Sequence, residues 1–271
     1  MKTAYDLTIA PVVVDIDDDG IPEVLVAAGA SCLCLSTTLG LRWQVDQHSS
    51  PSSDFRISGI AVADINNDDS PEVIFAGGHM ASARQSGLFV LDGTGAVLAF
   101  RPLLTGPALA GAPVICDIDG DGWKEVLVLD THGSLHCCRW SGETLVLAWS
   151  RVAWSRVVSG YVLNASPCLL DINGDGVREI LVSLEEGKIL ALSGVDGSSV
   201  ASIEHGYSSA IGGTPTGGDL DGDGRVEVLV PLLQAGRLLC FRVGAMTTGN
   251  WFRRWGFSAG RTGEVSDVDG G

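Results

Sequence analysis

Long apolar segments are missing from this sequence. None continues beyond about ten residues without a Gly, Pro or Asp, whereas a membrane-spanning helix needs about 20 apolar residues. Long amphipathic helices and membrane spans are therefore not expected. Charged residues are also few, at 18%, while glycine reaches 36 of the 271 residues. This combination is typical of short strands joined by tight turns, and the 45% apolar content is enough for a substantial core.

Positive charge is scarce relative to negative charge. The 17 Lys and Arg residues face 33 Asp and Glu residues, which gives a formal net charge of −16. A chain this acidic repels nucleic acid and anionic membranes, so we expect no nucleic-acid partner and no membrane insertion. The acids are not spread evenly, because 20 of the 33 lie in five short loops.

Signatures of zinc sites and of common enzymes are absent too. Cys32 and Cys34 form a Cys-x-Cys pair and Cys137 and Cys138 are adjacent, and neither is a zinc-ribbon spacing. We interpret the cysteines as small apolar residues of strands. The sequence has no Gly-x-Ser-x-Gly, no His-Glu-x-x-His and no Gly-rich phosphate loop, and its five histidines are scattered. The sequence therefore predicts no catalytic residues and favours a binding role over an enzymatic one.

One acidic motif recurs five times. It reads Asp-x-Asp-x-Asp-Gly-x-x-Glu with small variations, and an apolar strand precedes and follows each copy. The copies begin at Asp15, Asp64, Asp117, Asp171 and Asp219, which are 49, 53, 54 and 48 residues apart. A second pair of apolar segments follows each copy, joined by turns such as Asp92-Gly-Thr-Gly95 that are typical of hairpins. Each repeat therefore predicts four antiparallel strands, A to D, with the acidic loop joining A to B.

Four-stranded sheets at this period are typical of β-propeller blades. We predict an all-β fold in which a single propeller domain spans residues 1–249. Five blades are the simplest solution, with repeats near 10–58, 59–109, 110–164, 165–212 and 213–249. Residues 250–271 are expected to be a closing segment or a flexible tail. Either residues 2–9 or the tail around 251–257 could add a strand to the last blade.

The recurring loop between strands resembles the FG-GAP/VCBS repeat family, which includes the propeller of integrin α-subunits. The resemblance covers nearly the whole chain. The tail 250–263, with its Trp and Arg-Thr-Gly residues, is similar to segments that close some bacterial and archaeal propellers. The resemblance implies a propeller with an adhesion or interaction role. Since integrin-type rings have seven blades, a fragment of a larger ring stays open.

The loops carry the oxygen ligands that calcium prefers. Positions 1, 3, 5 and 9 offer side-chain oxygens, position 6 is suited to a sharp bend, and position 7 offers a backbone carbonyl. An EF-hand would need Glu at position 12 and flanking helices, but position 12 here is apolar and lies in a β-branched run. Plain Asp-rich turns would not require Glu at position 9 in every copy, and magnesium would demand stricter octahedral geometry. The predicted ligands are Asp15, Asp17, Asp19, Ile21 and Glu23; Asp64, Asn66, Asp68, Ser70 and Glu72; Asp117, Asp119, Asp121, Trp123 and Glu125; Asp171, Asn173, Asp175, Val177 and Glu179; and Asp219, Asp221, Asp223, Arg225 and Glu227.

The five predicted calcium sites are unequal. In the second loop Asn66 replaces an acid and Asp69 replaces the glycine, so we expect the site at Asp64 to be the weakest. Asn173 lowers the ligand charge of the fourth loop but keeps an oxygen. Up to five Ca²⁺ ions would change the net charge from −16 to about −6, and the relief of repulsion predicts that stability rises with free calcium.

The partner-binding surface is predicted on the face opposite the acidic loops, where the B–C and D–A loops are longer and more varied. The candidate residues there are Trp154, Arg156, Tyr161, His205 and Tyr207. We expect a protein or a glycan as partner, which leaves an interaction module, a lectin and a polysaccharide lyase as hypotheses. Calcium dependence favours an extracellular or cell-surface location. The sequence begins without the apolar stretch of a secretory signal, which could have been removed, so a cytoplasmic location is left open.

Overall fold

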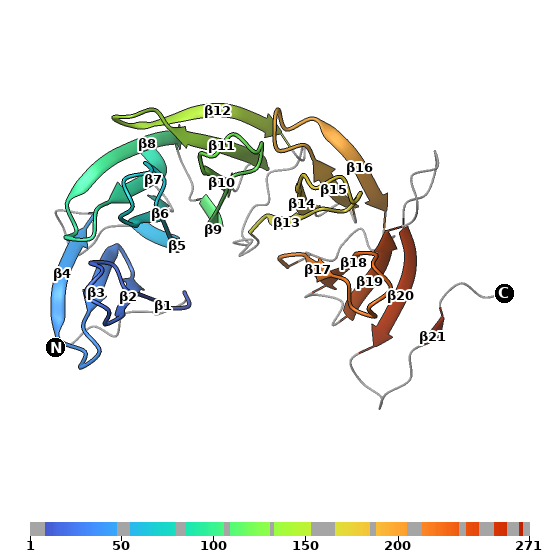
Figure 1. Ribbon diagram of the computed structural model, residues 1–271, viewed down its shortest axis with the longest axis horizontal. Coiled ribbons are helices and arrows are strands. Elements are labelled where there is room, and N and C mark those ends of the chain that lie inside the picture. Colours follow the sequence, from blue (N-terminus) through green and yellow to red (C-terminus); the bar gives the residue numbers. More distant parts are fainter. Residues whose placement is uncertain are drawn as a thin grey trace. The chain divides into compact units, whose positions relative to one another are not determined.

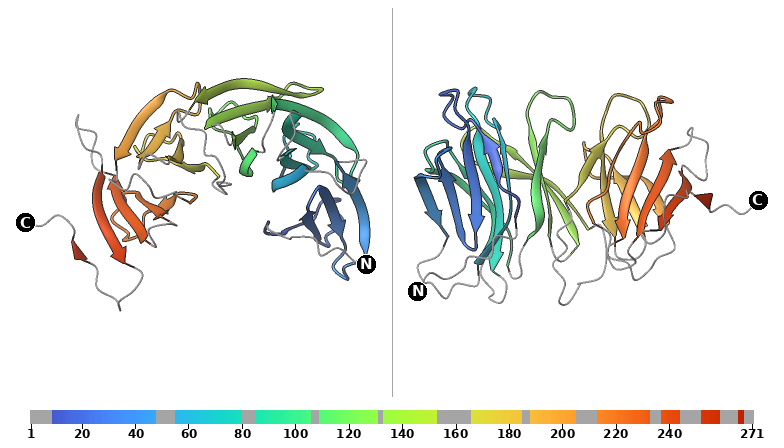
Figure 2. Two further views of the ribbon diagram at one scale, coloured as in Figure 1. Left: turned by 180° about the vertical axis from the view of Figure 1, so that it is seen from behind. Right: turned by 90° about the horizontal axis from the view of Figure 1, so that it is seen from below.

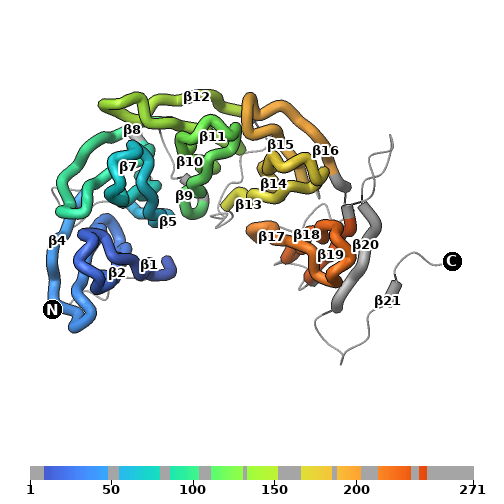
Figure 3. The backbone as a smooth tube through the Cα atoms, in the orientation of Figure 1, coloured from blue at the N-terminus to red at the C-terminus, as the bar shows by residue number. Residues whose placement is uncertain are grey.

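The computed structural model describes residues 9–47, 55–79, 85–105, 109–130, 133–152, 166–184, 188–204, 213–232, 237–243, 252–258 and 266–267 (Figure 1). Figure 3 draws the backbone as a tube in the same orientation. These residues form strands and turns, and no helix in them is long and apolar enough to cross a membrane. The chain divides into two compact units. One comprises residues 1–117, 121–131 and 135–150, and the other comprises residues 118–120, 132–134 and 151–271.

The first unit contains three four-stranded antiparallel sheets (Figure 1). The first and second sheets have the orders β1-β2-β3-β4 and β5-β6-β7-β8, and the third has the order β9-β10-β11-β12. The strands are β1 (Val12–Val14), β2 (Glu23–Ala28), β3 (Ser31–Leu35), β4 (Leu41–Asp46), β5 (Phe55–Ala63), β6 (Glu72–His79), β7 (Gln85–Leu91), β8 (Val97–Thr105), β9 (Leu109–Cys116), β10 (Glu125–Asp130), β11 (Ser134–Trp140) and β12 (Leu145–Val152).

The second unit contains a four-stranded sheet, β13-β14-β15-β16, and a five-stranded sheet, β17-β18-β19-β20-β21 (Figure 2). The strands are β13 (Cys168–Leu170), β14 (Glu179–Leu184), β15 (Lys188–Leu192), β16 (Ser199–Glu204), β17 (Thr216–Gly218), β18 (Glu227–Leu232), β19 (Arg237–Val243), β20 (Phe252–Ser258) and β21 (Ser266–Asp267). The fourth strand of the last sheet, β20, comes from the segment 250–271, and it pairs with β19 from Arg237↔Ser258 to Val243↔Phe252. The sequence left open whether the tail or residues 2–9 would add a strand to the last blade. The structure shows that the tail adds one, β20.

The predicted A–D pattern is confirmed as all-β structure in five antiparallel sheets of the described residues. In each sheet the acidic loop joins the first strand to the second, as between Val14 and Glu23 in the first sheet. Closure of the sheets into a five-bladed ring stays a prediction.

The inner strands are apolar on both faces because both faces are covered. Every residue of β6, β10 and β14 is buried. In the first unit, Leu25 and Cys34 of the first sheet pack with Phe75 and Phe89 of the second. The other face of the second sheet, including Ile74, packs with residues of the third, whose buried residues include Val126, Val128 and Cys138.

The core of the second unit has the same construction. Leu181, Ile189 and Ala191 of its first sheet pack with Val228, Leu239 and Phe241 of its second sheet. Each fully buried aliphatic or aromatic side chain of this kind stabilises the fold by about 1.5–3 kcal/mol. Face-to-face packing of neighbouring sheets therefore holds each unit together.

The cysteines take part in this packing. All seven carry thiols outside any disulfide and lie in strands, five of them buried. Burial raises the pKa of Cys32 to about 12, an effect that its neighbour Cys34 reinforces. A thiol of this kind stays protonated and unreactive, as expected for a small apolar core residue.

Candidate functional site

The five acidic loops have one backbone design. We number them loop 1 (residues 15–23), loop 2 (64–72), loop 3 (117–125), loop 4 (171–179) and loop 5 (219–227). In every loop, Oδ2 of the Asp at position 1 accepts a hydrogen bond from the N–H of position 6, over 2.8–3.1 Å. Oδ1 of the Asp at position 5 likewise accepts one from the N–H of position 7, over 2.7–2.9 Å. These bonds replace strand pairing and close a tight turn.

Positions 4 and 6 of each loop adopt positive φ angles. Glycine occupies these positions in loops 3, 4 and 5, but loop 2 has Asn67 with φ 59° and Asp69 with φ 68°. The N–H of Asp69 still donates to Asp64 Oδ2, over 3.1 Å. Loop 2 therefore closes like the other loops, since Asn and Asp tolerate the left-handed region better than most residues.

The glutamate at position 9 is buried in all five loops. Glu23, Glu72, Glu125, Glu179 and Glu227 are only 1–5% exposed. In loops 1, 2, 4 and 5 its Oε2 accepts a hydrogen bond from the N–H of position 2, over 2.9–3.2 Å. In these loops its Oε1 contacts an amide or guanidinium group that also contacts an acid of position 3 or 5. We call the place where the side chains of positions 3, 5 and 9 come together the loop centre.

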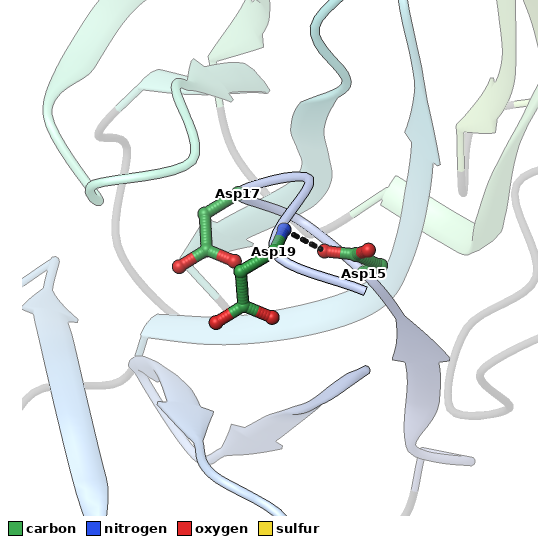
Figure 4. A group of neighbouring side chains, drawn as sticks. All are labelled: Asp15, Asp17 and Asp19. Carbon is green, nitrogen blue, oxygen red and sulfur yellow. Dashed lines mark hydrogen bonds between the residues drawn. The ribbon is translucent and has the colours of Figure 1, made fainter. Parts of the chain in front are cut away.

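Carboxylate oxygens converge in the three loops that have an acid at position 3. Ligand atoms of Asp15, Asp17 and Asp19 all lie within 4.8 Å of one another (Figure 4). The same holds for Asp117, Asp119 and Glu125 in loop 3, and for Asp219, Asp221 and Glu227 in loop 5. Oxygen groups this close could hold a hard divalent cation such as calcium.

An amide fills the loop centre in the two loops that have Asn at position 3. Asn66 Nδ2 donates to Asp68 Oδ2 over 3.0 Å and to Glu72 Oε1 over 3.1 Å. Asn173 Nδ2 makes the same pair of bonds in loop 4, both over 2.9 Å. The amide oxygens accept the N–H of position 5, over 2.8–2.9 Å, which fixes this orientation. The NH₂ group therefore satisfies two carboxylates without an added charge.

An arginine contacts the loop centre in loops 1 and 5. Arg42 on β4 forms ion pairs with Asp17 and Glu23. Arg242 on β19 forms ion pairs with Asp221, Asp223 and Glu227. The sequence analysis missed both residues. The signal for Arg242 was its place on the paired strand, directly across from the loop glutamate at Glu227↔Arg242.

Burial opposes ionisation of the glutamates in the amide-filled loops. Burial raises the pKa of Glu72 to about 7, and the nearby carboxylates of Asp68 and Asp64 add to the effect. The pKa of Glu179 is raised for the same reasons. A cation near these groups would favour their charged forms.

Loops 2 and 3 are joined to each other. Lys124 Nζ donates to the backbone oxygen of Asp64 over 2.9 Å, and Asn67 Nδ2 donates to that of Gly122 over 3.3 Å. The first two sheets are tied similarly, because Trp43 Nε1 donates to the oxygen of Gly93 over 2.9 Å. The ends of the sheets that carry the acidic loops are therefore connected by side chains as well as by core packing.

The structure tests few of the other residues singled out from the sequence. His136 is buried in β11, with its Nε2 2.8 Å from Asp130 Oδ2 and its Nδ1 3.1 Å from Ser150 Oγ. These bonds link three neighbouring strands, in accord with a strand histidine. The predicted partner-face residues lie outside the described residues; they are Trp154, Arg156, Tyr161, His205 and Tyr207.

Comparison with known proteins supports the repeat and the fold. Residues 117–182 match the family model described as an FG-GAP-like repeat. No curated protein matches the chain in sequence. Among solved structures, BamB from Moraxella catarrhalis aligns with a TM-score of 0.53 and 18% identity over 92% of this chain and 61% of its own.

Two further solved structures have a similar fold. The V. cholerae biofilm matrix protein Bap1 aligns with a TM-score of 0.53 and 21% identity over 80% of this chain and 32% of its own. Saccharomyces cerevisiae Sqt1 aligns with a TM-score of 0.61 and 9% identity over 97% of this chain and 62% of its own. The chain thus spans less than two thirds of each of these proteins. At such identities the likeness establishes a fold, and that fold is the β-propeller.

Proposed function

We propose that this chain, which carries an FG-GAP-like repeat and has the β-propeller fold, is a calcium-stabilised module that binds a partner protein. The observation that carries the calcium part is the convergence of three carboxyl groups within 4.8 Å in each of loops 1, 3 and 5. Calcium takes six to eight oxygen ligands, and each loop provides four oxygen-bearing side chains and one backbone carbonyl.

The loops rank differently from the order that sequence alone predicts. Loops 1, 3 and 5 each combine three aspartates with a buried glutamate, so we place the stronger sites there. In loops 1 and 5 calcium has to displace Arg42 or Arg242 from the carboxylates. In loops 2 and 4 it has to displace an amide that already satisfies two acids. Loop 4 thus joins loop 2 among the weaker proposed sites.

The proposed role of the ion is structural. It joins position 1 of a loop, at the end of one strand, to position 9, at the start of the next. Such an ion, enclosed by protein oxygens, leaves no open coordination position for chemistry. We therefore propose a binding function and not a reaction. Dissociation constants of about 0.1–1 mM are typical of extracellular calcium modules, and we place this protein at the cell surface or outside the cell.

Thermal unfolding tests the calcium part. We expect a melting temperature several degrees higher in excess calcium than in excess chelator, because an ion that binds only the folded state stabilises it. Asp119→Asn in loop 3 should reduce this difference, because it removes a proposed charged ligand, whereas Asn173→Asp in loop 4 should increase it, because it adds one. Melting curves that coincide with and without calcium would refute the calcium proposal.

A paired screen of arrayed peptides and arrayed glycans tests the partner class. We expect the protein to bind peptides in a calcium-dependent way. Binding to glycans alone would favour a lectin, and release of sugars from a bound polysaccharide would favour a lyase.

A further inference from the structure

A cavity of about 650 Å³ opens in the first unit, beside the acidic loops. Its walls come from three sheets: Asp17 from loop 1, Asp68 and Glu72 from loop 2, Asp92 from the β7–β8 turn, and Trp140 at the end of β11. We call it the Trp140 pocket. Volumes of about 300–1,000 Å³ are typical of pockets that hold small ligands or short peptide segments.

The charge of the Trp140 pocket has one sign. Four carboxyl groups line it, and none of its lining residues is basic. Among these four acids, Arg42 pairs with Asp17, and the Asn66 amide bridges Asp68 and Glu72. Asp17, Asp68 and Glu72 are also proposed calcium ligands, so with calcium bound Asp92 is the carboxylate left for a ligand of the pocket. An anionic ligand would be repelled by Asp92, and an apolar ligand would desolvate it without an opposite charge.

Asp92 is the acid of this pocket that belongs to no calcium loop. Burial opposes its ionisation, but hydrogen bonds from Thr94, Ala96 and Gly95 outweigh burial and hold its pKa below the usual value. Thr94 N, Thr94 Oγ1 and Ala96 N all donate to Asp92 Oδ1, over 2.7–2.9 Å. The turn thus fixes the orientation of a carboxylate whose charge is independent of any bound metal.

The pocket also has an apolar wall. Trp140 is half-buried, and Leu98 is 40% exposed although its side chain is fully apolar. An indole beside carboxylates attracts a cation through its ring face while it covers an aliphatic chain. The ligand that meets both requirements carries a cationic head on an apolar stem. Lysine and arginine side chains have this chemistry.

We propose that the Trp140 pocket binds a lysine or arginine side chain presented by a partner protein. The inference rests on the proposed function, since it names the chemistry of the partner. A protein segment is the occupant we favour over a free amine because the cavity exceeds the volume of one basic side chain and opens at the surface. It therefore accepts the peptide groups that flank the basic residue.

Fluorescence anisotropy with three labelled heptapeptides tests whether the Trp140 pocket binds a basic side chain. The peptides are identical except at the central residue, which is lysine, acetyl-lysine or norleucine. In excess calcium we expect the lysine peptide to bind at least about tenfold more tightly than the other two, and to weaken as salt rises. Butylammonium is the competitor that represents a free amine.

Three variants locate the binding. Asp92→Asn keeps the Oδ1 acceptor and removes the charge, and Trp140→Leu removes the ring; each should weaken the lysine peptide about tenfold. Asp196→Asn is the matched control, because Asp196 lies in the corresponding β15–β16 turn, is outside the pocket and accepts the Ser198 N–H over 2.9 Å. We expect it to bind like the unmodified protein.

Equal binding of the lysine and norleucine peptides would overturn the proposal, as would unchanged binding by both pocket variants. If butylammonium binds as tightly as the peptide, the pocket recognises a free amine and the partner-protein assignment is overturned. The proposed function fails separately, when no peptide of the array binds or when calcium leaves the melting temperature unchanged. Melting of Asp92→Asn in calcium and in chelator confirms that the variant is folded and keeps its metal response.

Discussion

The amide at the centre of loop 2 becomes an acid in the single substitution Asn66→Asp. Asn66 Nδ2 donates to Asp68 Oδ2 and Glu72 Oε1, over 3.0 and 3.1 Å. The substitution removes both bonds and places a third carboxylate oxygen about 3 Å from two others. A hydrogen bond to a charged group contributes about 1.5–3 kcal/mol, and exposed neighbours screen the added repulsion. In chelator we expect a loss of about 3 kcal/mol.

Calcium should reverse most of this loss. The variant loop 2 carries acids at positions 1, 3, 5 and 9, which is the pattern of loops 1, 3 and 5. A loss of about 3 kcal/mol corresponds to a fall of roughly 10 °C in melting temperature for a chain of this size. The assay is a fluorescence-detected thermal melt in chelator and in excess calcium. The shift caused by calcium should be larger in the variant than in the unmodified protein.

Asn67→Asp is the control for charge alone. It adds the same charge one residue away, where the side chain contacts only the Gly122 oxygen over 3.3 Å. We expect it to lose about 1 kcal/mol or less in chelator and to gain no extra calcium response. Equal losses in the two variants, or a loss in Asn66→Asp that calcium leaves unchanged, would refute the assignment of the amide to the loop centre.

Three further predictions follow from backbone, burial and packing. Asp69→Gly should stabilise the protein by about 1 kcal/mol in chemical denaturation, because φ 68° favours glycine; a loss would contradict this. The pKa of Glu72, raised to about 7 from 4.5, makes its contribution to stability full below pH 4.5 and lost as pH rises through 7. In chelator, Glu72→Gln should therefore flatten the fall of melting temperature between pH 4.5 and 7, and an unchanged fall would refute the assignment. Gly59→Ala should cost about 3 kcal/mol because its Cβ would lie 2.1 Å from Ala112 Cα, whereas the control Gly218→Ala meets nothing within 4 Å; similar stabilities would count against this packing.

The sheets and the loops were the predictable part of this protein. Turn residues alternating with β-branched runs predicted the strands, and the even spacing of the acidic loops predicted the repeat. The glutamate at position 9 could be recognised because it recurs in every copy, and its burial follows from its place at the start of an inner strand. These features depend on neighbours in sequence, so local patterns reveal them.

The motif alone did not predict which amide or arginine groups contact the carboxylates at the loop centres. A position-3 Asn looks like a weaker ligand in the sequence, but in the structure its NH₂ group donates hydrogen bonds to two carboxylates. Arg42 lies on β4, 19 residues from Glu23, and only strand pairing brings the two together. The Trp140 pocket combines residues of three repeats for the same reason. The prediction of a partner surface opposite the acidic loops stays untested.

The side-chain ties between repeats limit where this chain can be recombined. Lys124 and Asn67 each reach the backbone of the other's loop, so loops 2 and 3 are matched to one another. A chimera that replaces one of these repeats with another repeat of the chain would lose one of the two donors, because no other loop has Asn at position 4 or Lys at position 8. Exchange of loops 2 and 3 together would keep both ties. The smallest interchangeable piece of this region is therefore a pair of repeats, although the sequence is periodic in single ones.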